Sequence, residues 1–157
     1  MPEKSYPDRY HTLTPAIIVR GGAEAIEYYR QAFGATLIEE PHRLPDGKVM
    51  HAELKIGDSV FMLSDEFPES GFLSPAGYGG KTAVTLHFYV DDVDAVFDRA
   101  IQAGGTVVMP VADQFWGDRF GLLTDPFGHR WGVATHVREV SPDEMREAAQ
   151  KAMGGGS

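Results

Sequence analysis

The side chains best suited to chemistry in this chain lie in two short segments, where polar residues alternate with apolar ones. His51 and Glu53 occupy alternate positions in the first segment, and His87 and Tyr89 do so in the second. Alternate residues of a strand share one face, so each pair is expected to point the same way. An ordinary imidazole titrates near physiological pH and can act as a general acid or base on a bound small molecule. Tyr89 could donate a hydrogen bond to an oxyanion; the alternative is that all four are polar groups satisfied within a small barrel.

A second group of candidates lies together at Trp116, Asp118 and Arg119. Trp116 could stack on a planar ligand, and Arg119 could bind a carboxylate or phosphonate with two parallel hydrogen bonds. The alternative is a loop brace formed by Asp118 and Arg119, with Trp116 as a plug at the rim. Among the other histidines, we expect His129 to be structural because it lies in a turn, and we expect the remainder to be solvated, namely His11, His42 and His136.

The elements that must position these residues follow from an internal repeat. The segment from Val19 to Thr36 and the segment from Val90 to Thr106 show the same order of strand end, amphipathic helix, glycine and new strand. Each copy is too small to bury both of its faces alone. The sequence therefore predicts an α+β fold of two βαβββ modules, residues 13–64 and 82–137, with a cleft between them. The loop 65–81 is unusually apolar and is expected to cover a cleft rim or a subunit interface, or to pack on its own half.

Element boundaries follow from periodicity, turn residues and caps. A polar arm is expected at 1–12, a C-terminal segment at 138–157, and helices at 23–33 (ended by Gly34) and 92–103. Ser141 and Glu144 form a capping box that opens a helix to about residue 152, before a tail from Gly154 that is expected to be disordered. The predicted strands are 13–20, 36–44, 48–56 and 59–64 in the first module and 82–90, 105–111, 119–124 and 129–136 in the second, with a loop at 112–118.

Composition excludes several classes of function. The chain has 157 residues, 43% of them hydrophobic, and a net charge of −9, which argues against nucleic acid or an anionic membrane as a partner. It contains no cysteine, so disulfides, thiolate metal sites and a cysteine nucleophile are excluded. No run is long and apolar enough to span a membrane and the polar segment 1–9 is not expected to be a signal peptide, so we expect a cytoplasmic location. A phosphate-binding loop and a dinucleotide fingerprint are also missing.

The order of elements and four motifs resemble the vicinal oxygen chelate superfamily, which includes glyoxalase I, bleomycin-resistance proteins and extradiol dioxygenases. The likeness is greatest to its PhnB-like branch and covers residues 12–137. The resemblance implies two half-barrels around a cavity and, in most members, a homodimer. The motifs that carry it are Thr-Pro-Ala-Ile-Ile-Val (14–19), Met-His-Ala-Glu-Leu-Lys-Ile-Gly-Asp (50–58), Gln-Phe-Trp-Gly-Asp-Arg (114–119) and Asp-Pro-Phe-Gly-His-Arg-Trp (125–131).

The resemblance also implies where a metal would bind. Metal-dependent members take one ligand from the first strand and one from the last strand of each module, usually His, Glu or Gln. In this chain those positions are Thr14, Met62, Thr85 and Gly132. None offers an imidazole or a carboxylate, so neither a metal at the usual site nor any other cofactor is predicted. A relocated divalent metal site at His51, Glu53 and His87 is the alternative.

Two functions remain open at the level of sequence. The first is binding of a small, planar or anionic molecule in the inter-module cleft of a homodimer, without the usual metal. The second is an enzyme of lyase, isomerase, epimerase or dioxygenase type, with His51, Glu53 and His87 as the catalytic candidates. An interaction module without a ligand is weaker, because it leaves the inward-facing His87 and Tyr89 unexplained. The residues expected to contact the ligand are Tyr89, Trp116, Arg119, Thr85, Thr14 and Met62.

Overall fold

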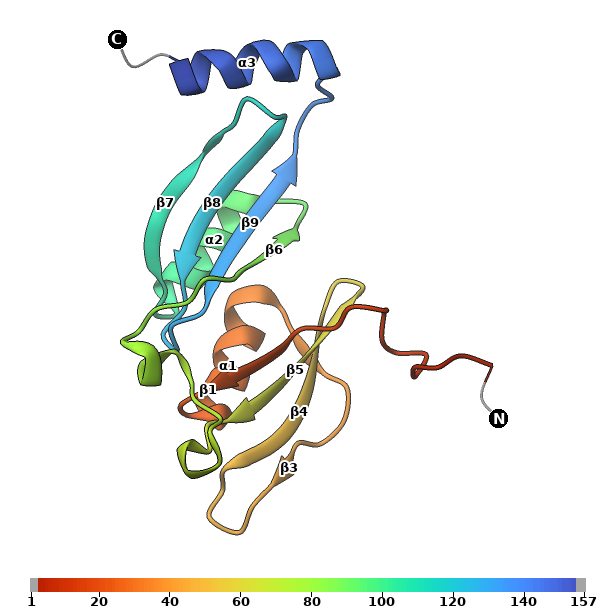
Figure 1. Ribbon diagram of the computed structural model, residues 1–157, viewed down its shortest axis with the longest axis vertical. Helices are drawn as coiled ribbons and strands as arrows, with labels where there is room; N and C mark the ends of the chain where they lie inside the picture. Colours follow the sequence, from red (N-terminus) through yellow and green to blue (C-terminus); the bar gives the residue numbers. More distant parts are fainter. Residues whose placement is uncertain (1–2, 155–157) are drawn as a thin grey trace.

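A computed structural model describes residues 3–154 of the chain. Within this range the chain forms two βαβββ modules, a crossover between them and a C-terminal helix (Figure 1). The first module contains β1 (Ala16–Val19), α1 (Gly22–Phe33), β2 (Thr36–Leu37), β3 (His42–Arg43), β4 (Val49–Ile56) and β5 (Ser59–Asp65). The second contains β6 (Thr85–Tyr89), α2 (Val93–Gln102), β7 (Thr106–Asp113), β8 (Asp118–Thr124) and β9 (Arg130–His136), and is followed by α3 (Pro142–Gly154).

The two modules share one strand topology. Their sheets have the orders β1-β5-β4-β2, with β3 also paired to β4, and β6-β9-β8-β7. In both sheets the first strand runs parallel to the last strand, while the remaining pairs are antiparallel. The predicted α+β fold of paired modules is therefore confirmed.

The predicted helices of the two modules, α1 and α2, form because the polar groups at their ends find hydrogen-bond partners and their apolar faces are buried. The α1 helix ends at Gly34, whose φ of 67° is the left-handed conformation that glycine adopts readily. Its start has no side-chain cap of its own, but the buried carboxylate of Asp65 accepts hydrogen bonds from the amides of Gly21 and Gly22 at 3.0 and 2.9 Å. Asp92 caps α2 through the amide of Ala95, at 3.1 Å.

One hydrophobic core joins the modules. The α1 side chains Tyr29 and Phe33 pack against Phe61 of the first sheet and Trp131 of the second. The Tyr29 hydroxyl also donates to the buried Asp125 carboxylate at 2.5 Å, and the Trp131 indole donates to the same oxygen at 2.8 Å. Helix α1 is thus a shared layer between two sheets (Figure 1).

Several predicted boundaries were wrong. The strand expected at 36–44 is divided into β2 and β3, because Pro41 has no amide hydrogen and the pairing register shifts at His42 and Arg43. Strands β1 and β6 are shorter than the predicted 13–20 and 82–90, and the loop 112–118 shrinks to 114–117. The capping box at Ser141 is confirmed, since its hydroxyl accepts from the Glu144 amide at 3.2 Å. Gly154 ends α3 rather than beginning a disordered tail, and residues 155–157 lie outside the described range.

The crossover between the modules is held at both sides. Glu66 accepts hydrogen bonds from the Ser74 hydroxyl and from Arg20 Nε, both at 2.6 Å, and Ser74 is fully buried. Farther along, Pro75 packs so closely on the β8–β9 turn that a Cβ at Gly128 would lie 2.6 Å from its ring. The crossover contains two short 3₁₀ helices and starts one residue later than predicted, because Asp65 belongs to β5. None of the helices within residues 3–154 is long and apolar enough to cross a membrane.

Candidate functional site

The seam between the modules contains two hollows. Strands β1 and β6 are edge strands of their sheets; both line one hollow, whereas β6 and the segment just before β1 line the other. We call the first the His87 hollow, with a volume of about 410 Å³; its walls include Leu13, the turn 57–59, residues 86–89 and Trp131. We call the second the crossover hollow, with a volume of about 480 Å³; its walls include residues 15–18, Leu73, Tyr78, residues 81–84, His129 and Arg130. Pro15 and Leu86 line both hollows.

The His87 ring is positioned by packing. It stacks on Phe120 with ring centroids 5.5 Å apart and an interplanar angle of 26°, and it meets the edge of Tyr89 at 5.1 Å. Gly132 lies beneath it, and a Cβ at that position would be 2.6 Å from His87 Nδ1. Neither nitrogen of His87 is hydrogen-bonded to another residue in the described part of the chain. The imidazole therefore has a fixed position and unused hydrogen-bonding capacity beside a hollow.

Tyr89 and Trp116 converge on one buried carboxylate, that of Asp118. The Tyr89 hydroxyl and the Trp116 indole donate to Oδ2 at 2.8 and 3.2 Å, and His136 Nδ1 lies 2.8 Å from Oδ1. Burial alone would raise the pKa of Asp118, but the hydrogen bonds from His136, Tyr89 and Trp116 outweigh burial and lower it. The hydrogen bond to Asp118 in turn raises the pKa of Tyr89.

His136 is part of this network and is not simply solvated, which corrects the expectation from sequence. Its Nδ1 faces Asp118, and its Nε2 faces Glu139 at 3.0 Å. Because a carboxylate accepts hydrogen bonds, this arrangement favours the doubly protonated ring. The hydrogen bond to Asp118, followed by that to Glu139, raises the pKa of His136.

Arg119 is placed away from the seam. Adjacent residues of a strand point to opposite faces, so Arg119 lies across the sheet from the Asp118 carboxylate. Its guanidinium forms two hydrogen bonds to Asp94 of α2, at 2.8 and 2.9 Å, and a third to Asp113 at 3.2 Å. Arg119 therefore braces β8 against α2 and lines neither hollow.

Glu53 lies in a cluster that the polar arm completes. Arg9 donates to its two carboxylate oxygens at 2.7 and 3.2 Å, Tyr10 also donates to it, and His51 Nε2 is 3.2 Å away. The hydrogen bonds from Arg9, aided by Tyr10 and His51 and opposed by burial, lower the pKa of Glu53 to about 2. Glu53 is thus an ionised, fully engaged carboxylate at neutral pH, and it cannot readily act as a base.

The three residues of the relocated metal hypothesis are not brought together. His51 and Glu53 lie on β4 of the first sheet, whereas His87 lies on β6 of the second and contacts Phe120. Within residues 3–154, no group of three or more His, Cys, Asp or Glu side chains is arranged to hold a metal ion.

The four positions that the resemblance assigns to metal ligands do not fit a divalent cation. Pairing sets Met62 beside Ala16 and Gly132 beside His87; Thr14 precedes β1, two residues before Ala16, and Thr85 begins β6, two residues before His87. Thr14 donates its hydroxyl hydrogen to the His11 carbonyl at 3.2 Å, and the space above Gly132 is filled by the rings of His87 and Phe120. Hydroxyl and thioether groups alone are poor donors for such an ion.

Sequence reasoning did not find the contacts of Arg9, Tyr10 and Phe120. Arg9 and Glu53 are 44 residues apart, and no periodic pattern links an irregular arm to a strand. Phe120 could have been found from its place two residues after Asp118, because alternate residues on a strand share a face.

Comparison with known proteins defines the class of this one. The model of the Glyoxalase/Bleomycin resistance protein/Dioxygenase superfamily matches residues 10–133, and the chain belongs to this superfamily. It is 45% identical over 149 residues to the uncharacterized protein Rv0887c of Mycobacterium tuberculosis, covering 92% of this chain and 85% of that protein.

Two solved structures resemble the chain over most of its length. One is protein PA1353 from Pseudomonas aeruginosa, with a TM-score of 0.62, 29% identity and coverage of 82% of this chain and 99% of that one. The other is the At5g48480 gene product of Arabidopsis thaliana, with a TM-score of 0.64, 27% identity and coverage of 80% and 98%. Membership of the PhnB-like branch stays a prediction based on the motifs.

Proposed function

We propose that this protein binds a small, planar molecule in the His87 hollow without a metal ion. The observation that supports this proposal most directly is the His87 ring itself. It is fixed by Phe120 and Tyr89, yet both of its nitrogens are unused by the described residues around it. His87 is exposed beside the hollow, so its nitrogens are open to a ligand that exchanges hydrogen bonds with water for hydrogen bonds with the ring.

The chemistry of the hollow defines the ligand further. Tyr89 donates its hydroxyl hydrogen to Asp118, so its oxygen is left to accept from a ligand donor. Phe88, Phe61 and Trp131 add apolar wall to the same hollow. A flat ring system with one donor and one acceptor group matches these features, and stacking on the aromatic side chains would add to its affinity.

The enzyme alternative receives less support. It requires Glu53 as a base or metal ligand, but Arg9 and Tyr10 occupy its carboxylate and hold its pKa near 2. It also requires His51 and His87 at one centre, and these residues lie in different sheets.

We also propose a homodimer in which a second copy covers part of the second sheet. Strand β7 is an edge strand, and its Val107, Val108 and Met109 are each more than 40% exposed. An exposed apolar edge of this kind readily pairs with another chain. Sedimentation velocity at micromolar concentration tests the assembly, and a purely monomeric protein would refute it. A cytoplasmic location remains a prediction from the sequence.

Thermal unfolding with a panel of planar heteroaromatic compounds tests the binding proposal. A ligand at 100 times its Kd stabilises the folded state by about 2.7 kcal/mol, which is about 5–10 °C for a chain of this size. The His87→Ala variant should lose most of that shift, whereas His42→Ala, an exposed histidine outside both hollows, should keep it. Equal shifts in the wild type and in His87→Ala would contradict the proposal.

A further inference from the structure

The crossover hollow carries an unusual charge for this protein. Lys81, His129 and Arg130 line it, and none of its 14 lining residues, all within the described part of the chain, is acidic. The chain as a whole has 23 acidic residues and a net charge of −9. A hollow with cationic walls on an acidic protein is electrostatically suited to an anion.

The two cations of this hollow, Lys81 and Arg130, have no internal counter-ion. Neither Lys81 nor Arg130 forms an ion pair with a residue in the range 3–154. Arg130 Nε is also the one buried side-chain nitrogen or oxygen of the described residues that lacks a hydrogen-bond partner. Because Nε is closed off from solvent, an acceptor in the hollow would be bound by the terminal N–H groups of the guanidinium, and a carboxylate can accept two hydrogen bonds from them together.

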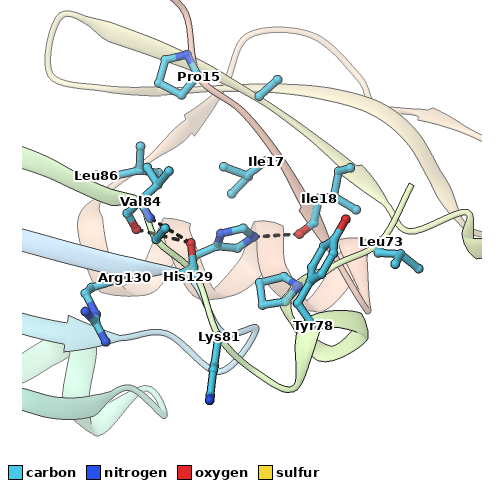
Figure 2. Close-up of a pocket in the computed structure, with 14 residues that line it drawn as sticks. Pro15, Ile17, Ile18, Leu73, Tyr78, Lys81, Val84, Leu86, His129 and Arg130 are labelled. Carbon is cyan, nitrogen blue, oxygen red and sulfur yellow. Dashed lines mark hydrogen bonds between the residues drawn. The ribbon is translucent and has the colours of Figure 1, made fainter. Parts of the chain in front are cut away.

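The rest of the hollow is apolar and preformed. Ile17, Leu73, Val84 and Leu86 line it, and His129 crosses it to donate from Nε2 to the Ile18 carbonyl at 2.7 Å (Figure 2). That hydrogen bond joins the second module to the first. The crossover wall is fixed by the Glu66–Ser74 hydrogen bond and by the contact of Pro75 with Gly128. Little ordering is therefore required when a ligand enters.

From these observations we propose that the crossover hollow is a second ligand site, which binds an organic carboxylate with a compact apolar body. In Figure 2 the charged ends of Lys81 and Arg130 lie away from His129, on the side opposite Pro15. The carboxylate then lies at this charged side, and the apolar body extends toward Ile17, Val84 and Leu86. This site is separate from the one proposed at His87, and it does not depend on it.

The experiment uses 2-naphthoate as an anionic probe and 2-naphthamide as its neutral counterpart, with binding followed by calorimetry. We expect the wild-type protein to bind the carboxylate at least about tenfold more tightly than the amide, since hydrogen bonds to charged groups are the stronger ones. Arg130→Met and Lys81→Met should each remove most of that preference. Arg43→Met serves as the matched control, because Arg43 is exposed and lines neither hollow.

Lys81 is exposed, so Lys81→Met removes a charge without disturbing a buried contact. This variant therefore tests the charge even if Arg130→Met fails to fold. Equal affinities for acid and amide, or a preference unchanged in both Lys81→Met and Arg130→Met, would overturn the inference. Loss of naphthoate binding in His87→Ala alone would place the probe in the other hollow and also reject it. The proposal at His87 stands or falls by its own variant, so the two failures can be distinguished.

Discussion

Asp118, at the start of β8, is only 3% exposed. Its carboxylate nevertheless binds three polar side chains of the second sheet and the loop before β8. Tyr89, Trp116 and His136 each donate a hydrogen bond to its carboxylate. Three such donors stabilise the charged form of a buried carboxylate. Each of those side chains is thereby fixed in orientation. The buried charge thus positions Tyr89 at the edge of the His87 hollow without contacting a ligand itself.

The pKa of His136 leads to a prediction about pH. Because Asp118 and Glu139 raise this pKa above its ordinary value of 6.5, the stability that His136 contributes is fully present below about pH 6.5. That contribution is lost as the pH rises through the higher folded-state pKa. We expect the difference in unfolding temperature between the wild type and His136→Gln to shrink between pH 6 and pH 9. An NMR titration of the His136 ring gives the pKa directly, and a value below 6.5 would refute the prediction.

At the scale of elements, the polar arm breaks the symmetry of the duplication. Arg9 and Tyr10 cover Glu53 on the face of β4 opposite the helix, whereas the corresponding face of the second sheet leaves Thr85, His87 and Tyr89 exposed. The arm thus occupies one module and leaves the other accessible. This asymmetry supports one binding hollow at His87 rather than two equivalent ones.

Removing the arm contact should have a measurable cost. In Arg9→Ala the Glu53 carboxylate keeps Tyr10 and His51 but loses its charged partner, and we expect a lower free energy of unfolding than in the wild type. Hydrogen exchange should increase across residues 3–12. The matched control is Arg30→Ala, because Arg30 forms an exposed ion pair with Glu27 and should change stability by less than about 0.5 kcal/mol. Unchanged exchange in the arm would show that Arg9 does not hold it.

The elements differ in how far the sequence could predict them. Helix α1 was predicted at 23–33 and found at Gly22–Phe33, because apolar periodicity and the Gly34 cap are local signals. The break at Pro41 and the bulged pairing of β3 were missed, since they depend on which strand lies alongside. The hydrogen bonds from Arg9 to Glu53 and from Arg119 to Asp94 depend on tertiary distances that no local pattern encodes. The repeat is a pattern within the sequence, and it predicted the seam between the modules. The separation of His51 from His87 depends on tertiary distances and was not foreseen.

At the scale of the whole molecule, α1 makes the two modules depend on each other. Its Tyr28 hydroxyl donates to the Ala100 carbonyl of α2 at 2.9 Å, and Tyr29 reaches Asp125 between β8 and β9. One buried cluster contains side chains from both sheets. The halves of the duplication therefore share a core and should unfold together.

The Tyr29→Phe variant tests this coupling. It removes one donor from the buried Asp125 carboxylate, which keeps hydrogen bonds from Trp131 and from the amides of Phe127 and His129. We expect a loss of about 1–3 kcal/mol in the free energy of unfolding. Tryptophan fluorescence and far-ultraviolet circular dichroism should still give coincident denaturation curves. Two separate transitions would indicate that the modules unfold independently.

Gly132 also restricts how this site can change over generations. The imidazole of His87 and the ring of Phe120 occupy the space above it, so a Cβ would lie 2.6 and 2.9 Å from their atoms. A mutation to His or Glu, which would introduce a donor at the position that the family resemblance assigns to a metal ligand, meets a filled space. Such a side chain fits only if residue 87 or 120 also becomes smaller. The stacked pair of His87 and Phe120 and a metal ligand at position 132 therefore exclude each other, and a single substitution cannot exchange one for the other.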